Sequence, residues 1–247
     1  MTQTSATHPS SAIPAKTGTA IPHMGVRVAL RFAIMTPLVI AIFFLPAGTV
    51  RWWQGWLFIA VYIGFALAAF FLFLKTDPEL VRRRLEAREP LRAQRRIIGF
   101  GALLLTAIFT LPGFDHRLGW SRAWLGVEPT WLELPSLAIV LACEFGIGWA
   151  MWINRYAART IRVEEGQKVI SGGPYRVVRH PLYSFSLVMF LFAPLALGSC
   201  VTVPALLLFT PIFVLRILNE EKVLRAELPG YTEYCARTRW RLLPGLW

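Results

Sequence analysis

Charged residues are scarce in this 247-residue chain, where they account for 16% of positions, against about 25% in an average soluble domain. Acidic residues are the scarcer kind, because 14 Asp and Glu stand against 26 Lys and Arg, which gives a net charge of +12. Hydrophobic residues account for 55% of the chain, and its mean hydropathy is +0.51. This composition favours a protein that lies in lipid over an ordinary soluble domain.

Cysteine is also rare, with three residues far apart in the chain, Cys143, Cys200 and Cys235. They form no CxxC pair, so the sequence indicates neither a zinc site nor a disulfide framework, and we predict no metal site. The glycine fingerprint of dinucleotide-binding domains is absent as well. We expect the three thiols to be small buried or interfacial hydrophobic groups.

The chain begins with a polar segment, residues 1–26, rich in Ser, Thr, Ala and Pro. It has no apolar core of signal-peptide length, and we predict a disordered tail without a catalytic role.

Long apolar runs dominate the remainder, and a helix needs about 20 such residues to cross a bilayer. Residues 27–153 contain four of them, Phe32–Val50, Trp56–Leu74, Ile97–Phe114 and Leu132–Ile153. Two more runs, Tyr183–Gly198 and Val201–Leu218, predict a helical hairpin over residues 183–218, bent by Pro194, Pro204 and Pro211. The sequence therefore predicts an all-α, polytopic membrane helix bundle of five or six spans.

The basic residues are unevenly distributed between the loops. With alternating spans, 23 of the 26 Lys and Arg fall on one side, and Arg51, Arg117 and Arg122 on the other. The positive-inside rule then predicts that both termini are cytoplasmic. Anionic headgroups explain the net charge, so we expect a lipid partner and no nucleic acid.

An arginine-rich segment after Asp77-Pro78 predicts an amphipathic helix at the headgroups, with Arg82, Arg83, Arg84 and Arg88.

Polar side chains gather on either side of the predicted hairpin. Before it, residues 163–183 read VEEGQKVISGGPYRVVRHPLY, with a turn signal at Gly172-Gly173-Pro174 and a proline at the expected helix start. After it come the Glu220-Glu221 pair, two tyrosines and a closing R-x-x-x-x-P from Arg239 to Pro244. A hairpin returns the chain to the side that it left, so we expect both segments to meet at the cytoplasmic face.

Adjacent residues of a helix point about 100° apart. We therefore expect at most one of Glu220 and Glu221 to face a pocket, while the other meets Arg216 or solvent. Glu144 lies inside the fourth apolar run, and we expect it to make a structural hydrogen bond to Trp149 or to a neighbouring helix.

The pattern GGPYRVVRHPLY, an apolar hairpin, R-x-x-x-E-E-x-x-L, Y-x-x-Y and R-x-x-x-x-P resembles the isoprenylcysteine carboxyl methyltransferase family, and also the related phospholipid methyltransferases. The resemblance covers roughly residues 154–244, so we predict a membrane-embedded methyltransferase region over 154–247. It implies S-adenosyl-L-methionine as cofactor and a methyl transfer that needs no covalent protein intermediate.

The resemblance also implies roles for individual residues. Arg216, Glu220 and Tyr183 would be catalytic, with Arg216 near the acceptor. Cofactor binding would fall to Gly173, Pro174, Tyr175, Arg179, His180, Pro181, Tyr183, Glu220, Glu221, Tyr231 and Tyr234.

A site at the mouth of a lipid-facing hairpin suggests an apolar or lipid-like acceptor that enters from the membrane. A carboxylate acceptor is favoured, with an amine or a thiol as alternatives, and the oligomeric state is left open. We expect the inner membrane of a bacterium, with the site facing the cytoplasm. Two other functions compete: an NADPH-dependent membrane reductase of the sterol-reductase type, and a non-enzymatic membrane protein whose polar cluster is an interfacial anchor.

Overall fold

The computed structural model describes residues 24–86, 92–126, 130–156, 163 and 166–247. All regular structure within these residues is helical, which confirms the predicted all-α class. Five helices are long and apolar enough to cross a membrane. The predicted tail lies outside the described residues except for its last three, where the first helix begins.

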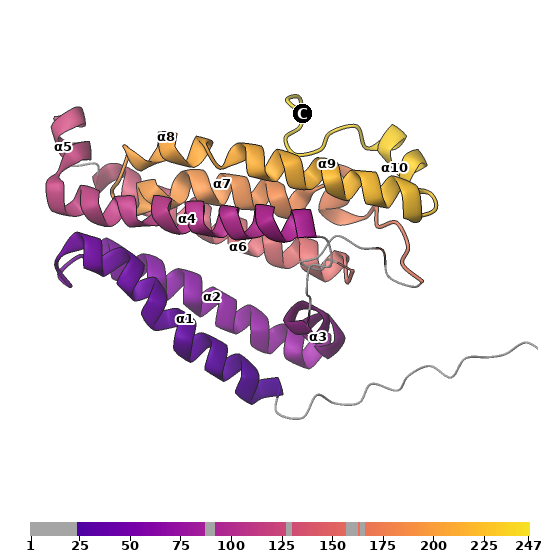
Figure 1. The fold of residues 1–247 in the computed structure, drawn as a ribbon, viewed down its shortest axis with the longest axis horizontal. Coiled ribbons are helices and arrows are strands. Elements are labelled where there is room, and N and C mark those ends of the chain that lie inside the picture. The colour runs from indigo at the N-terminus through magenta and orange to yellow at the C-terminus, as the bar shows by residue number, and fades with distance from the viewer. Residues whose placement is uncertain (1–23, 87–91, 127–129, 157–162, 164–165) are drawn as a thin grey trace, which may run out of the picture.

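The helices form one bundle in which chain neighbours lie mostly antiparallel (Figure 1). In chain order they are α1 (Met24–Ala47), α2 (Trp53–Thr76), α3 (Pro78–Glu86), α4 (Arg92–Leu118), α5 (Trp120–Leu125), α6 (Thr130–Ile153), the 3₁₀ turn η1 (Gly173–Arg176), α7 (Pro181–Ala196), α8 (Thr202–Leu207), α9 (Thr210–Glu227) and α10 (Tyr231–Arg237).

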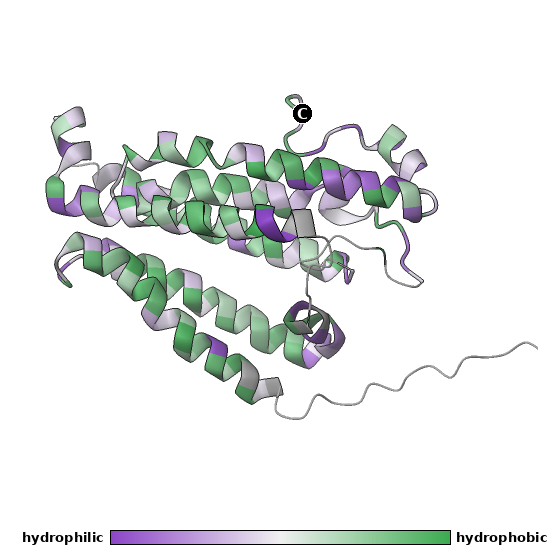
Figure 2. Cartoon of the chain, viewed as in Figure 1, coloured by the Kyte–Doolittle hydropathy of each residue, from purple (hydrophilic) through white to green (hydrophobic). Residues whose placement is uncertain are grey.

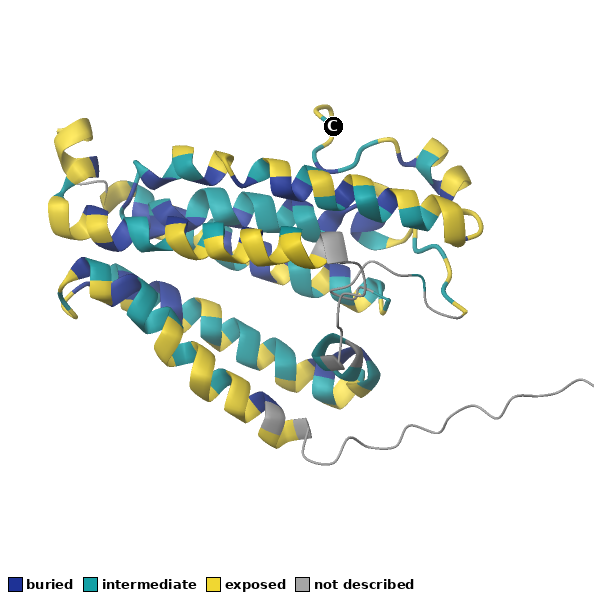
Figure 3. Ribbon diagram, viewed as in Figure 1, coloured by how far each residue is buried: buried dark blue, intermediate teal, exposed yellow. Residues whose placement is uncertain are grey.

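Apolar side chains cover the outside of the long helices as well as their contacts. Hydropathy is high along the bodies of α1, α2, α4 and α7 (Figure 2), and much of the outward surface of α1 and α4 is exposed (Figure 3). Leu103 is 70% exposed and Ile34 63%. Water does not favour such surfaces, whereas lipid chains do, so these faces suit the bilayer.

Close helix contacts depend on small residues. α6 packs along α7, and α1 packs along α4. At the first contact, a Cβ added to Gly146 would lie 2.5 Å from the ring of Phe185. Only glycine therefore allows these two helices to approach as they do.

The last hairpin differs from the prediction in two ways. The run after residue 200 is broken into α8 and α9 between Leu207 and Thr210, ahead of Pro211, which cannot continue an α-helical hydrogen-bond ladder. The helix also continues past the apolar run, from Leu218 to Glu227. Glu220 and Glu221 are therefore helical residues, held by the same backbone as the membrane span.

The bundle has two polar ends. The turn between α7 and α8 reaches the end where α4 and α5 meet, because Ser199 Oγ donates to Asp115 Oδ2 at 2.5 Å and the amide of Cys200 to Ser121 Oγ at 2.8 Å. The hairpin thus runs the length of the bundle. The opposite end carries α3, α10 and the C-terminus (Figure 1).

Glu144 is buried in α6, yet it makes no hydrogen bond with any described residue. The expected structural hydrogen bond to Trp149 or a neighbouring helix is therefore not seen among the described residues. Trp149 itself is half exposed on the outer face.

Candidate active site

The η1 turn begins the site and requires a glycine. Gly173 has a φ of +53°, a conformation that residues with a Cβ rarely adopt. A Cβ there would also lie 3.1 Å from Ile153 at the end of α6. The turn buries the ring of Tyr175 and is fixed from the other side, because Tyr234 of α10 donates its hydroxyl to the Tyr175 carbonyl at 2.8 Å. η1 and α10 are thereby joined.

The start of α7 carries Arg179 and His180, both buried. Pro181 occupies the first turn of the helix, where no backbone donor is needed. The two amides before it are taken up by the C-terminal segment: Arg179 donates to the carbonyl of Trp240 at 2.9 Å, and His180 to that of Arg241 at 3.0 Å.

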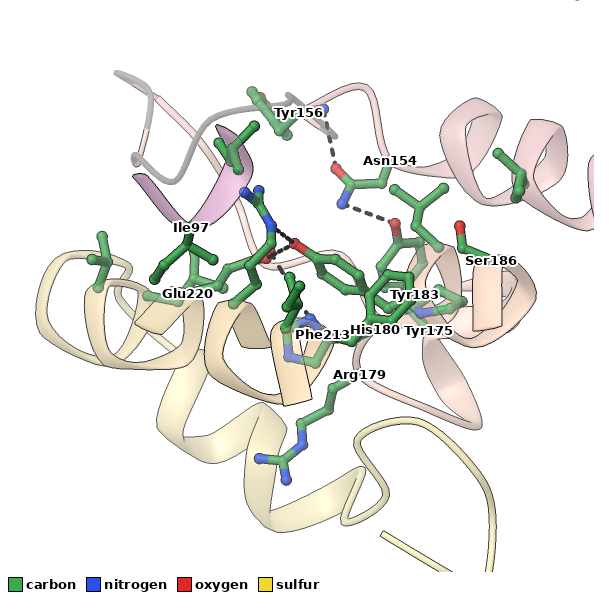
Figure 4. Close-up of a pocket in the computed structure, with 18 of the residues that line it drawn as sticks. Ile97, Asn154, Tyr156, Tyr175, Arg179, His180, Tyr183, Ser186, Phe213 and Glu220 are labelled. Carbon is green, nitrogen blue, oxygen red and sulfur yellow. Dashed lines mark hydrogen bonds and ion pairs between the residues drawn. The ribbon is translucent and has the colours of Figure 1, made fainter. Parts of the chain in front are cut away.

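A cavity of about 920 Å³ opens between these elements, the N-terminal half of α4 and α9. Its polar residues lie around Tyr183 and Tyr175 (Figure 4). Nine predicted residues line it: Tyr175, Arg179, His180, Pro181, Tyr183, Arg216, Glu220, Tyr231 and Tyr234. The other predicted residues, Gly173, Pro174 and Glu221, are not part of this lining.

A chain of hydrogen bonds crosses the cavity between α7 and α9. Arg216 Nε donates to the hydroxyl of Tyr183 at 3.2 Å, and this hydroxyl donates to Glu220 Oε2 at 3.1 Å. The three side chains come from the two halves of the motif, as the hairpin topology predicted. Because Glu220 keeps 30% of its side chain exposed, its carboxylate is available to a ligand.

Glu221 points away from these hydrogen bonds and lies among three arginines and His180. Its side chain is 4% exposed, with Oε1 lying 3.2 Å from Arg179 and 3.4 Å from His180 Nε2. Oε2 lies 3.2 Å from Arg241 and 3.5 Å from Arg225. One carboxylate of the pair thus faces the cavity, as predicted. The other meets three arginines and His180, in place of Arg216 or solvent.

Burial favours the neutral form of three tyrosines of the site. Burial raises the pKa of Tyr175 to about 12 and also raises the pKa of Tyr231 and of Tyr234. The Tyr175 hydroxyl accepts from Asn154 Nδ2 at 3.2 Å. The Tyr231 hydroxyl is buried and has no hydrogen-bond partner among the described residues, although the residue lines the cavity. An unpaired buried hydroxyl is costly, so this group suits a ligand.

The cavity continues into an apolar arm between α4 and α9. Its walls are the side chains and backbone of Ile97, Gly101, Leu105, Phe190, Phe209, Ile212 and Phe213. Tyr183 packs edge-on against Phe213, with ring centroids 5.6 Å apart. The hydrogen-bonded residues Arg216, Tyr183 and Glu220 therefore adjoin the apolar arm, where Tyr183 meets Phe213.

Three cationic residues of the lining were missed by the prediction of the site: Arg84, Arg95 and Lys168. The sequence pattern predicts that Arg84 lies on a headgroup-facing helix. The contribution of α4 depends on how α3 and α4 pack, which no local pattern shows. Arg88 of the same cluster lies outside the described residues. Within the described residues, no three His, Cys, Asp or Glu gather as a metal ion would require.

Comparison with known proteins agrees with the motifs. Residues 135–228, from α6 to the end of α9, match the sequence model of the phospholipid methyltransferase family. The resemblance to membrane methyltransferases is thereby confirmed over these residues. The cobalt-zinc-cadmium resistance protein CzcN of Cupriavidus metallidurans is 28% identical over 145 residues, which make up 58% of this chain and 62% of that relative. The similarity thus spans less than two thirds of the length of that protein.

Proposed function

Because residues 135–228 match a family of methyltransferases, we propose that this protein transfers a methyl group from S-adenosyl-L-methionine to a membrane-borne, apolar acceptor. The site would face the cytoplasm from the inner membrane of a bacterium. One observation carries the proposal: the Arg216–Tyr183–Glu220 chain stands where a polar cavity meets an apolar arm.

The polar part of the cavity fits the methyl donor. The orphan hydroxyl of Tyr231 offers a hydrogen bond, Glu220 offers a carboxylate for the donor's ammonium group, and Leu224 and Leu228 offer an apolar surface for adenine. When bound, S-adenosylmethionine supplies an electrophilic methyl group on its sulfonium.

The donor's carboxylate needs cations, and we assign it to Arg84 and Lys168. Arg179, the expected partner, has its guanidinium within 3.2 Å of Glu221 and of the Arg239 carbonyl. In Figure 4 its side chain extends away from Tyr183 and Glu220. Arg84 and Lys168 both line the cavity, and their positive charges suit a carboxylate.

The apolar arm suits the acceptor's hydrocarbon part, with its reactive group directed toward Arg216. A guanidinium positions a carboxylate well, so a methyl ester is the favoured product. If the acceptor were an amine, Glu220 would take its proton. In either case the walls of α4 and α9 hold the reactants in line and keep water out, and alignment is the main contribution an enzyme makes to such a displacement.

Incubating membranes that contain this chain with radiolabelled methyl donor tests the proposal. We expect label in the lipid-extractable fraction, released by base as methanol. Membranes with Tyr183→Phe should incorporate label at a rate lower by about 10-fold or more. Label that resists base would indicate a methylated amine or thiol in place of the ester. Membranes without chain-dependent label, or with chain-dependent NADPH oxidation instead, would rule the proposal out.

A further inference from the structure

The C-terminal residues 239–242, here named the clasp, lie across the start of α7. The carbonyls of Trp240 and Arg241 accept from the amides of Arg179 and His180, at 2.9 and 3.0 Å. Ser184, one turn into α7, donates its Oγ to the carbonyl of Leu242 at 2.6 Å. Three successive carbonyls of the clasp therefore hold the segment that enters the cavity.

Glu221 of α9 connects the clasp to Arg179 and His180, the two residues before α7. Its Oε1 faces Arg179 and His180, while its Oε2 faces Arg241 of the clasp, at distances of 3.2, 3.4 and 3.2 Å. Arg225 reaches the same Oε2 at 3.5 Å but belongs to the next turn of α9. One buried carboxylate thus joins three parts of the chain: α9, the start of α7 and the clasp.

The orientation of His180 follows from this contact. An Nε2–H that donates to Glu221 leaves Nδ1 on the side of Glu220, whose Oε1 lies 4.0 Å away. Arg179 in turn gives its guanidinium to Glu221 and to the Arg239 carbonyl at 3.2 Å. The clasp therefore helps to fix the geometry of both Arg179 and His180.

We propose that Glu221 and Arg241 are positioning residues: they lock the clasp onto α7 and thereby set the backbone and side chain of His180 for the ligand, without contacting the ligand themselves. This inference rests on the proposed function, because the ligand is the methyl donor. A buried carboxylate is costly unless it is paired. Arg241 is the partner of Glu221 that belongs to the clasp, so its loss removes the link between the two and releases the clasp.

Three variants test the proposal: Arg241→Ala, Arg241→Lys and, as matched control, Arg225→Ala. Arg225 contacts the same oxygen as Arg241 but has no connection to the clasp. Arg241→Ala should raise the Kd for S-adenosylhomocysteine and the KM for the methyl donor about 10- to 100-fold, the usual effect of losing a charge-assisted hydrogen bond, with a smaller change in kcat. Arg241→Lys should restore most of the binding, and Arg225→Ala should stay within about 3-fold of the wild type.

Hydrogen–deuterium exchange gives a readout that needs no ligand. Peptides containing the amides of Arg179 and His180 should exchange faster in Arg241→Ala and should stay protected in Arg225→Ala. If Arg241→Ala does not fold, Ser184→Ala removes a single contact of the clasp and should raise the same exchange more mildly.

The outcomes separate the two proposals. Unchanged exchange and unchanged binding in Arg241→Ala would overturn the positioning role. A wild-type protein that binds no S-adenosylhomocysteine, yet shows clasp-dependent exchange, would instead overturn the proposed function and leave the clasp in place.

Discussion

Glu220 and Glu221 are neighbours in the chain, yet they sit in opposite environments. Glu220 is partly exposed to the cavity and accepts from Tyr183, whereas Glu221 is buried among arginines and His180. The difference arises from the roughly 100° between successive helical residues. We therefore propose that Glu220 takes part in the chemistry and that Glu221 has a positioning role, although the two side chains are identical.

Replacing each carboxylate by its amide should separate these tasks. We expect Glu221→Gln to destabilise the protein by about 3 kcal/mol, because the buried Arg179 loses its counter-charge. Glu220→Gln should leave the thermal midpoint nearly unchanged while it lowers methyl transfer. Thermal unfolding of both variants in the same detergent checks this, and equal midpoints would contradict the division.

The hydroxyl of Tyr183 should matter for the reaction more than for the fold. Tyr183→Phe keeps the ring against Phe213 but removes the contacts to Arg216 and Glu220. We expect kcat to fall about 10-fold or more, the scale of a hydrogen bond to a charged group, with little change in unfolding temperature. A variant with wild-type kcat would show that the hydroxyl has no part in the reaction.

Among the elements, most of the apolar runs predicted the long helices to within about five residues, because lipid imposes length and hydropathy on each span. One exception is α1, which begins at Met24, well before the predicted start at Phe32. The run Ile97–Phe114, for example, lies inside α4 (Arg92–Leu118). The break between α8 and α9 was predicted only as a bend. The extension of α9 to Glu227 was missed, because polar residues after a span look the same in a loop and in a helix.

The site was predictable where motif and topology coincide, as for Tyr183, His180 and Glu220. Its other parts depend on long-range packing. Arg84 and Lys168 reach the cavity from segments that only the folded bundle brings close. The surroundings of Glu221 depend on where the C-terminal segment returns, and no spacing in the sequence states that.

The contact between α6 and α7 supplies a prediction with an internal control. Gly146→Ala places a methyl group 2.5 Å from the Phe185 ring, so we expect a loss of about 1–3 kcal/mol from overpacking. Gly148→Ala, two residues later, meets its nearest neighbour at 3.7 Å and should be neutral or slightly stabilising. Comparing the unfolding midpoints of the two variants tests this prediction, and equal midpoints would contradict the close contact between α6 and α7.

For the whole molecule, charge and cavity share one end. α3, α10 and the mouth of the cavity lie at that end, with the arginines of α3, the start of α4 and the C-terminal segment. The other end holds Arg51, Arg117 and Arg122 beside the turns. The positive-inside rule places the side of a membrane protein that is richer in Lys and Arg in the cytoplasm, so the charged end should be cytoplasmic.

Cysteine labelling tests this orientation. In a chain whose three native cysteines are replaced by alanine, Arg237→Cys on α10 and Trp124→Cys on α5 place exposed thiols at opposite ends. A membrane-impermeant maleimide added outside intact bacterial cells should label the Trp124→Cys chain and leave the Arg237→Cys chain unlabelled until the cells are opened. The reverse pattern would invert the topology.

Equilibrium binding of radiolabelled S-adenosylmethionine to the purified protein tests whether the cavity holds a methyl donor. We expect saturable binding of one molecule per chain, displaced by S-adenosylhomocysteine but not by NADPH. Binding should weaken about 10-fold in Glu220→Ala, which loses a charge-assisted contact, and persist in Arg225→Ala. Absence of binding, or displacement by NADPH, would contradict the account.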